Sequence, residues 1–277
     1  MDEGGPAGQR AHGFEAPLHP LQVSSWVVFA LDVLVYAGIV LPFLDPLLLR
    51  VAAIVFGASA ASLVFSAAAA TSCDPGVVAG RQARGDDISA LGEQGDLSPE
   101  FCDDCRVPMA PRSKHCNVCN KCVEVFDHHC MWLNNCVGRR NYKAFFATIV
   151  SASATTGAVM GTCLYVLIGC ASDPDSLQRR KSAIALSLGL PPGLVFALTG
   201  VLAAMNAPLF LLDTQLVFLH IFLMTQRLTT HEYITSKWAH EAGEDIGVDA
   251  DPAADSPTGA QSAWEPQGAG GGGGGAE

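Results

Sequence analysis

Long apolar runs alternate with polar stretches along the chain. The apolar runs extend from Trp26 to about Leu44, from Val51 to Ala70, from Ala144 to about Cys170, and from Leu194 to Met224. A helix needs about 20 consecutive apolar residues to cross the ~30 Å hydrocarbon core of a bilayer. The pattern therefore predicts four membrane-spanning helices, with a long polar insert between the second and the third.

The last apolar region is too long for one regular span. Three residues that disfavour an apolar helix interrupt it, namely Asn206, Pro208 and Asp213. We expect the fourth span at about 202–224, with 194–201 as a partly embedded lead-in. A fifth span near 183–204 is the alternative, but it would place the polar segment after the last span on the opposite side of the membrane from the insert.

These stretches divide the chain into seven segments. They are an N-terminal segment at 1–22, helices one and two at 23–70, a linker at 71–101, a cysteine-rich module at 102–142, helices three and four at 143–224, a polar segment at 225–240 and a tail at 241–277. Residues 1–15 and the tail are rich in Gly and polar residues, so we expect both to be disordered. No internal repeat is evident.

Composition agrees with a membrane protein that carries one compact polar insert. Of the 277 residues, 49% are hydrophobic and only 16% are charged, which is too apolar for an ordinary soluble domain. The net charge of −11 argues against a nucleic-acid partner. Twelve of the sixteen Lys and Arg residues fall in the N-terminus, the 71–143 loop and the tail. The positive-inside rule therefore predicts that the insert and both termini are cytosolic.

The polar insert concentrates the metal-binding residue types. Seven of the ten cysteines and three of the eight histidines lie within 102–142. Their C-x2-C pairs, followed at short intervals by His and Cys, are typical of tetrahedral zinc sites. Two zinc sites would use eight of these side chains and leave one Cys and one His. Spacing alone does not say which pair is left over, and the pair is either a thiolate nucleophile with its base or part of a purely structural knuckle.

One tetrapeptide within this insert indicates a family. Asp127-His128-His129-Cys130 closely resembles the motif of the DHHC-type protein S-acyltransferases (palmitoyltransferases). The resemblance covers roughly residues 16–235. Four further motifs are similar, namely Asp74-Pro75-Gly76, Asn135-Cys136-Val137-Gly138, Asn141-Tyr142 and Thr229-Thr230-His231-Glu232.

The resemblance implies two zinc ions with interleaved ligands. The first would be held by Cys102, Cys105, His115 and Cys122, and the second by Cys116, Cys119, His129 and Cys136. This assignment leaves Cys130 and His128 as the spare pair. Because the insert has little hydrophobic core, metal binding would supply a large part of its folding free energy.

The resemblance also implies an activity for the spare pair. Cys130 would attack a long-chain fatty acyl-CoA such as palmitoyl-CoA, His128 would accept the thiol proton, and Asp127 would orient the imidazole. Thr230 would hydrogen-bond Asp127, and Glu232 would tie the segment after the last span to the module. Arg112 and Lys114 are candidate partners for the CoA phosphates. The alternative is a catalytically weak membrane zinc scaffold that binds partner proteins.

Together these features predict an all-α polytopic membrane protein. Four transmembrane helices would carry a cytosolic zinc-binding module between the second and the third. The expected partners are fatty acyl-CoA, the lipid bilayer and membrane-associated proteins with cytosolic cysteines, without nucleic acid. The expected location is the endomembrane system (ER, Golgi or endosome) or the plasma membrane, with the active site cytosolic.

Overall fold

The computed structural model describes residues 8–77, 101–173 and 189–242. The predicted disordered tail therefore lies almost entirely outside the described residues, as does most of the 71–101 linker. The chain divides into a unit from Met1 to Glu232 and a second unit from Tyr233 to Glu277.

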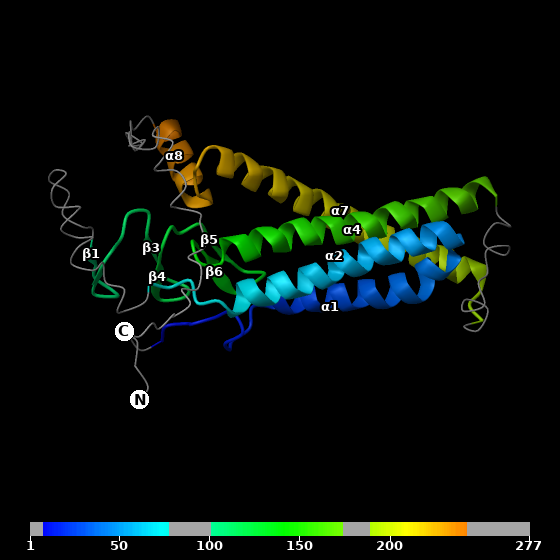
Figure 1. The fold of residues 1–277 in the computed structure, drawn as a ribbon, viewed down its shortest axis with the longest axis horizontal. Helices are drawn as coiled ribbons and strands as arrows, with labels where there is room; N and C mark the ends of the chain where they lie inside the picture. The colour runs from blue at the N-terminus through cyan, green and yellow to red at the C-terminus, as the bar shows by residue number, and fades with distance from the viewer. Residues whose placement is uncertain (1–7, 78–100, 174–188, 243–277) are drawn as a thin grey trace, which may run out of the picture. The chain divides into compact units, whose positions relative to one another are not determined.

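Among the described residues, four helices are long and apolar enough to cross a membrane. They are α1 (Pro20–Val35), which continues through a π-helical turn η1 (Tyr36–Val40) and a 3-10 turn η2 (Leu41–Phe43), then α2 (Pro46–Ser72), α4 (Tyr142–Ser172) and α7 (Pro192–Thr225). The cysteine-rich module lies between the second and the third (Figure 1). The predicted polytopic helical architecture is confirmed.

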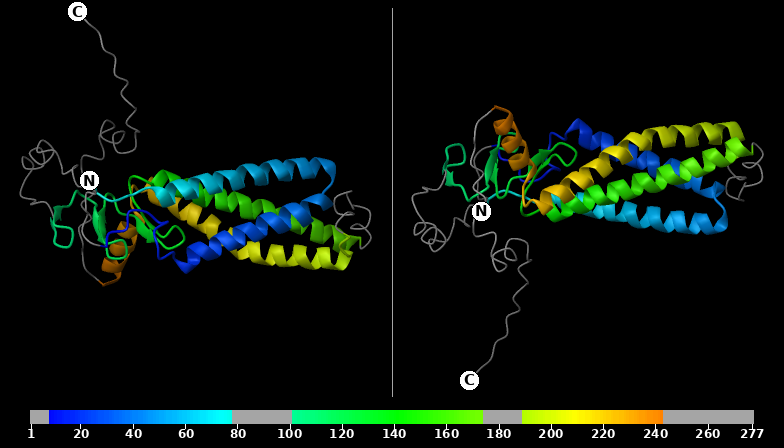
Figure 2. Two further views of the ribbon diagram at one scale, coloured as in Figure 1. Left: turned by 90° about the horizontal axis from the view of Figure 1, so that it is seen from below. Right: turned by 90° about the horizontal axis from the view of Figure 1, so that it is seen from above.

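The second, third and fourth helices pack side by side, with α4 between α2 and α7 (Figure 2). Hydroxyl pairs join the three helices. Ser62 and Ser151 lie 2.7 Å apart across the α2–α4 contact, and Ser153 and Thr214 lie 2.8 Å apart across the α4–α7 contact. Small polar residues of this kind let helices approach closely in an apolar medium.

The fourth helix differs from the expectation. The sequence predicts a span at about 202–224 with a separate lead-in, whereas α7 runs without a break from Pro192 to Thr225 and contains Pro208. The Asn206 side chain donates to the Leu202 carbonyl and to the Asp32 carboxylate, both at 3.0 Å. The side-chain NH2 group thus finds both of its partners inside the helix bundle, and the residue does not interrupt the helix.

The cysteine-rich module consists of three short antiparallel hairpins. They pair β1 (Phe101–Cys102) with β2 (Val107–Pro108), β3 (Lys114–Cys116) with β4 (Lys121–Val123), and β5 (His128–Cys130) with β6 (Asn135–Val137). Strands of two or three residues show no alternating pattern in the sequence, which explains why the sequence did not reveal them. Isolated hairpins of this size are unstable in water, so the module needs other contacts.

Two asparagines attach the module to the end of α2. The Asn135 side chain donates to the carbonyls of Ala70, Thr71 and Cys73 at 3.1, 3.2 and 2.8 Å. The Asn141 side chain donates to Ala70 at 3.2 Å. The last carbonyls of a helix have no partner within it, so these amides satisfy them and fix the module to the helix.

The N-terminal segment is ordered where disorder was expected. Within residues 8–15, the Gly13 N–H donates to the Thr71 carbonyl at 2.8 Å, and the Gly13 carbonyl accepts from Gln22 at 3.1 Å and from Asn134 at 3.2 Å. A Cβ atom at Gly13 would overlap the backbone oxygen of Leu133. The expectation of disorder is therefore wrong for residues 8–15, because this glycine permits close packing against the module.

Candidate metal centres and active site

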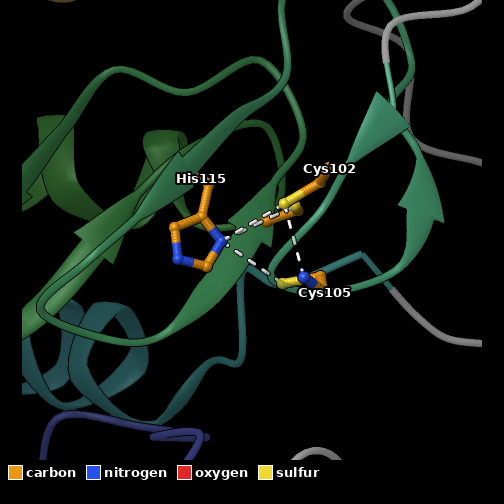
Figure 3. A group of neighbouring side chains, drawn as sticks. Cys102, Cys105 and His115 are labelled. Atoms are coloured by element: carbon orange, nitrogen blue, oxygen red, sulfur yellow. Dashed lines mark hydrogen bonds between the residues drawn. The ribbon is translucent and has the colours of Figure 1, made fainter.

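The first ligand cluster joins the first two hairpins. The His115 Nδ1 atom lies 3.6, 3.3 and 4.0 Å from the sulfur atoms of Cys102, Cys105 and Cys122. Cys102 and Cys105 come from the β1–β2 turn, whereas His115 and Cys122 face each other across the β3–β4 pair. Figure 3 shows the sulfurs of Cys102 and Cys105 directed at the same nitrogen of the His115 ring.

The second cluster repeats this arrangement one hairpin further along. The His129 Nδ1 atom lies 3.8, 3.4 and 3.6 Å from the sulfur atoms of Cys116, Cys119 and Cys136. Cys116 and Cys119 come from the β3–β4 turn, and His129 faces Cys136 across the β5–β6 pair. Each cluster therefore takes two ligands from one hairpin and two from the next.

Both clusters have the dimensions of a tetrahedral zinc site. In each, the four ligand atoms all lie within 4.8 Å of one another. Zn–S bonds of about 2.3 Å and Zn–N bonds of about 2.0–2.1 Å would place sulfur and nitrogen about 3.6 Å apart, in the middle of the observed range. The donor sets therefore fit zinc.

Asp127 and His128 form a separate, tightly bonded pair. The His128 Nδ1 atom lies 2.6 Å from an Asp127 carboxylate oxygen. Thr230 donates its backbone N–H and its hydroxyl to the same carboxylate at 2.9 and 2.8 Å. Burial raises the pKa of Asp127, but the hydrogen bonds from His128 and Thr230 outweigh it and hold this pKa below its usual value. The aspartate is therefore held as an ion with its orientation fixed.

Cys130 and His128 alter each other's ionisation. Burial lowers the pKa of His128, but its interactions with Asp127 and Cys130 are stronger and raise this pKa to about 9. Burial raises the pKa of Cys130, but His128 and the backbone N–H groups of Leu133 and Trp132 outweigh it and lower this pKa. The site therefore favours a thiolate beside an imidazolium, the reactive form of a cysteine nucleophile.

Cys130 lies where the module meets the membrane-spanning helices. It is 8% exposed and belongs to an apolar cluster to which α2, α4 and the β5–β6 hairpin contribute, comprising Ala70, Cys130, Leu133, Val137, Tyr142, Phe145 and Ile149. Leu216 and Val217 of α7 pack against this cluster. The thiol therefore faces a mainly apolar environment formed by three of the helices.

Sequence reasoning missed one histidine beside this site. His220 of α7 is 1% exposed, and its ring centroid lies 6.2 Å from that of His128 and 5.0 Å from that of Phe145. Its Nδ1 atom lies 2.9 Å from the Tyr142 hydroxyl. The only sequence signal was a single histidine within an apolar run, which usually indicates a satisfied residue of a helix interface.

Arg112 and Glu232 form a bidentate ion pair. Arg112 Nε and Nη2 lie 2.6 Å from Glu232 Oε1 and Oε2 respectively, and Nη2 also donates to the Arg227 carbonyl at 3.1 Å. Glu232 further accepts from the Thr229 N–H at 2.7 Å, which caps the first turn of α8 (Thr230–Ala242). Burial raises the pKa of Glu232, but hydrogen bonding to Arg112 outweighs it and lowers this pKa. The pair fixes the turn that presents Thr230 to the aspartate.

This pairing changes the expectation for the CoA phosphates. The sequence predicts Arg112 and Lys114 as ligands of the CoA phosphates. In this structure the guanidinium of Arg112, which would bind a phosphate, forms an ion pair with Glu232. Lys114 lies on β3, opposite Val123 of β4, and is half-buried. The assignment of Arg112 to a phosphate stays a prediction, and it would require the guanidinium to leave Glu232.

Fold and site together define a multi-pass membrane protein with two Cys3His clusters and a separate Cys-His-Asp constellation. A family model described as DHHC palmitoyltransferase matches residues 96–237, which is just over half of the chain. The chain belongs to the DHHC palmitoyltransferase family.

Several characterised members of this family are similar to the chain over about half of its length. It is 35% identical over 143 residues to palmitoyltransferase ZDHHC5-A of Danio rerio, covering 50% of this chain and 16% of the relative. It is 33% identical over 150 residues to palmitoyltransferase erf2 of Emericella nidulans, covering 54% and 22%. It is 34% identical over 149 residues to palmitoyltransferase ZDHHC18 of Homo sapiens, covering 54% and 35%. The match thus spans about a third or less of each relative's own length.

Proposed function

We propose that the protein is a protein S-acyltransferase. It would move a long-chain fatty acyl group from acyl-CoA to cysteine thiols of membrane-associated proteins, through an acyl-enzyme on Cys130. One observation carries the proposal. Of the seven cysteines of the module, all of which the structure describes, Cys130 alone lies outside both clusters and beside the Asp127–His128 pair. A zinc scaffold would need none of these three residues.

The first half-reaction follows from this geometry. His128 takes the Cys130 proton, and the thiolate attacks the thioester carbonyl of acyl-CoA. A new C–S bond forms to Cys130, the bond to the CoA sulfur breaks, and CoA leaves with the proton that His128 returns. Asp127 stabilises the imidazolium formed in between, as the acidic member of a catalytic triad does.

The second half-reaction repeats these steps with a protein thiol. The cysteine of the substrate protein loses its proton to His128 and attacks the acyl-enzyme. Its sulfur gains the acyl group, and Cys130 leaves as the thiolate and regains its proton. Thioester is exchanged for thioester, so no external energy source is needed and ping-pong kinetics are expected.

The acyl chain would lie among the helices beside Cys130. Each buried CH2 contributes about 0.8 kcal/mol, so an apolar environment next to the thiol favours a long chain. The apolar cluster of α2, α4 and α7 residues around Cys130 supports this position. We place the CoA phosphates near Arg112 and Lys114, and the module on the cytosolic side of an endomembrane or plasma membrane, following the positive-inside rule.

Zinc at the two clusters would hold the three hairpins together. Each cluster supplies four protein ligands, which leaves no open position for a substrate. The eight ligand residues would therefore stabilise the module and take no part in bond exchange. Because the strands are so short, removal of the metal should unfold the module.

Incubation with radiolabelled palmitoyl-CoA tests the proposed function. The purified protein in detergent should acquire about one label per chain, and neutral hydroxylamine should release it because it cleaves thioesters. CoA should appear in a matching burst, the kinetic signature of an acyl-enzyme. Absence of label from a sample that retains both zinc ions would contradict the proposal and favour the scaffold.

Thr230→Val should slow acyl-enzyme formation by about 10–100-fold. The change removes the hydroxyl that donates to Asp127 at 2.8 Å but keeps the backbone donor at 2.9 Å. A hydrogen bond to a charged group contributes about 1.5–3 kcal/mol. Thr225→Val is the matched control, because that hydroxyl donates only within its own helix, to Phe222 at 2.7 Å. Equal single-turnover rates for the two variants would show that the Thr230 hydroxyl does not contribute to acyl-enzyme formation.

A further inference from the structure

The three hairpins of the module repeat every 14 residues. The last residue of each first strand is a cysteine, and it lies opposite the residue five positions later: Cys102 faces Val107, Cys116 faces Lys121 and Cys130 faces Asn135. The sequence alone showed no repeat architecture, whereas the hairpins recur at this short period. In the sequence, mainly the cysteines and histidines of the ligand clusters recur at this step, and most of the residues between them differ.

The turns of the three hairpins also have the same backbone conformation. The fourth residue after each cysteine has a positive φ, at 55° for Arg106, 51° for Asn120 and 52° for Asn134. Few non-glycine residues adopt this conformation, so its recurrence at one position shows a common turn. In the first turn the Cys105 N–H donates to the Cys102 sulfur at 3.4 Å.

The ligand sets follow the same 14-residue step. We call a hairpin whose first strand ends in such a cysteine a knuckle. Each ligand cluster consists of that cysteine and the residues 3, 13 and 20 positions later. This rule gives Cys102, Cys105, His115 and Cys122 for the first cluster, and Cys116, Cys119, His129 and Cys136 for the second. One further step gives Cys130, Leu133, Lys143 and Val150. Only the first of these four can bind a soft metal ion through sulfur or imidazole.

We propose that the β5–β6 hairpin is a third zinc knuckle that has no metal, in which Leu133 stands at the second ligand position and keeps Cys130 available as a nucleophile. The proposal rests on the proposed function for the role of Cys130, but its geometry does not. Leu133 is 6% exposed and packs in the same apolar cluster as Cys130. A metal ion at this thiolate would therefore find no second sulfur.

A knuckle without a metal ion would explain why one of the seven cysteines of the module is reactive. A zinc knuckle directs backbone N–H groups at its first cysteine and so stabilises the thiolate. In the first two hairpins a bound zinc ion would coordinate this thiolate and block its attack on a carbonyl. In the third knuckle the same turn is kept and the metal is excluded, so the stabilised thiolate remains reactive, with His128 as its proton partner.

Restoring the second ligand tests the proposal directly. Leu133→Cys creates a Cys130-x2-Cys pair with the spacing of Cys102 and Cys105. Each variant is first loaded with its two resident zinc ions and then titrated with Zn²⁺. The first readout is protection of Cys130 from N-ethylmaleimide, measured by mass spectrometry of its peptide. The second is acyl-enzyme formation.

We expect Zn²⁺ to protect Cys130 in Leu133→Cys at a concentration at least tenfold lower than in the unmodified protein. A chelator should restore both alkylation and acylation. Trp132→Cys is the matched control, since it adds a thiol one position out of register at a site that is 51% exposed. Leu133→Ala reports the effect of lost packing alone.

The outcomes separate this inference from the proposed function. Equal protection by Trp132→Cys and Leu133→Cys, or no protection by either, would overturn the knuckle assignment even if the protein transfers acyl groups. Failure of the unmodified protein to acquire acyl label would overturn the function, while the alkylation result would still decide the geometry. If Leu133→Cys does not retain two zinc ions, Leu133→His offers a second donor at the same position and is held to the same outcomes.

Discussion

Cys130→Ser is expected to abolish the acyl-enzyme and to leave both zinc ions bound. The serine hydroxyl is a far weaker nucleophile than a thiolate, and the mutated sulfur belongs to neither ligand cluster. Hydroxylamine-sensitive label should fall to background, and zinc should stay at two per chain. Both are measured on one preparation, because each alone could report unfolding.

Cys73→Ser is the matched control for this substitution. Cys73 is half-buried at the end of α2 and lies outside both clusters. This variant should keep its label and its zinc. Loss of about one zinc ion per chain from Cys130→Ser would show that the ligand assignment is wrong. Retention of the label would show that another cysteine carries the acyl group.

His128→Ala and His129→Ala should fail in different ways, although the two residues are adjacent. Neighbouring residues on a strand point to opposite faces, and both lie on β5. The His128 Nδ1 atom lies 2.6 Å from Asp127, whereas the His129 Nδ1 atom lies 3.4–3.8 Å from three cysteine sulfurs. One side chain therefore serves the thiol chemistry and the other serves the metal.

His128→Ala should keep both zinc ions and lose about 10²–10⁴-fold in acyl-transfer rate, the usual contribution of a general base. His129→Ala should lose one zinc ion and become sensitive to proteolysis, because binding energy at a structural zinc site is also folding energy. Limited proteolysis and zinc content in the same detergent separate the two. If His128→Ala is the unstable, zinc-poor variant, the roles are reversed. If both are equally unstable, neither histidine is spare.

The features that the sequence predicted are those that leave a regular pattern. Four apolar runs were sufficient to predict four membrane-spanning helices, because span length is set by the bilayer. The C-x2-C spacing predicted two clusters, because two thiols three residues apart reach one metal. The spare Cys130 and His128 followed from the family motif, and their catalytic role stays a prediction; the structure places His128 2.6 Å from Asp127.

The features that the sequence did not predict depend on contacts between distant residues. Gly13 packs against Leu133, and Arg112 pairs with Glu232 across 120 positions of the chain. His220 lies beside His128 only because α7 returns to the end of the module. Asn206 leaves α7 unbroken because Asp32 of another helix accepts its hydrogen bond. No local pattern encodes such partners, so a single sequence could not reveal them.

The interleaving of the two clusters also sets an order of assembly during synthesis. Chains are made from the N-terminus and fold as they emerge. Cys102 and Cys105 cannot close their site until Cys122 has left the ribosome, and Cys116 and Cys119 must wait for Cys136. The hairpin that carries Cys130 is therefore the last to be secured, immediately before α4 begins at Tyr142. A shortage of zinc during translation would stop maturation at this point, with the reactive cysteine not yet held in place.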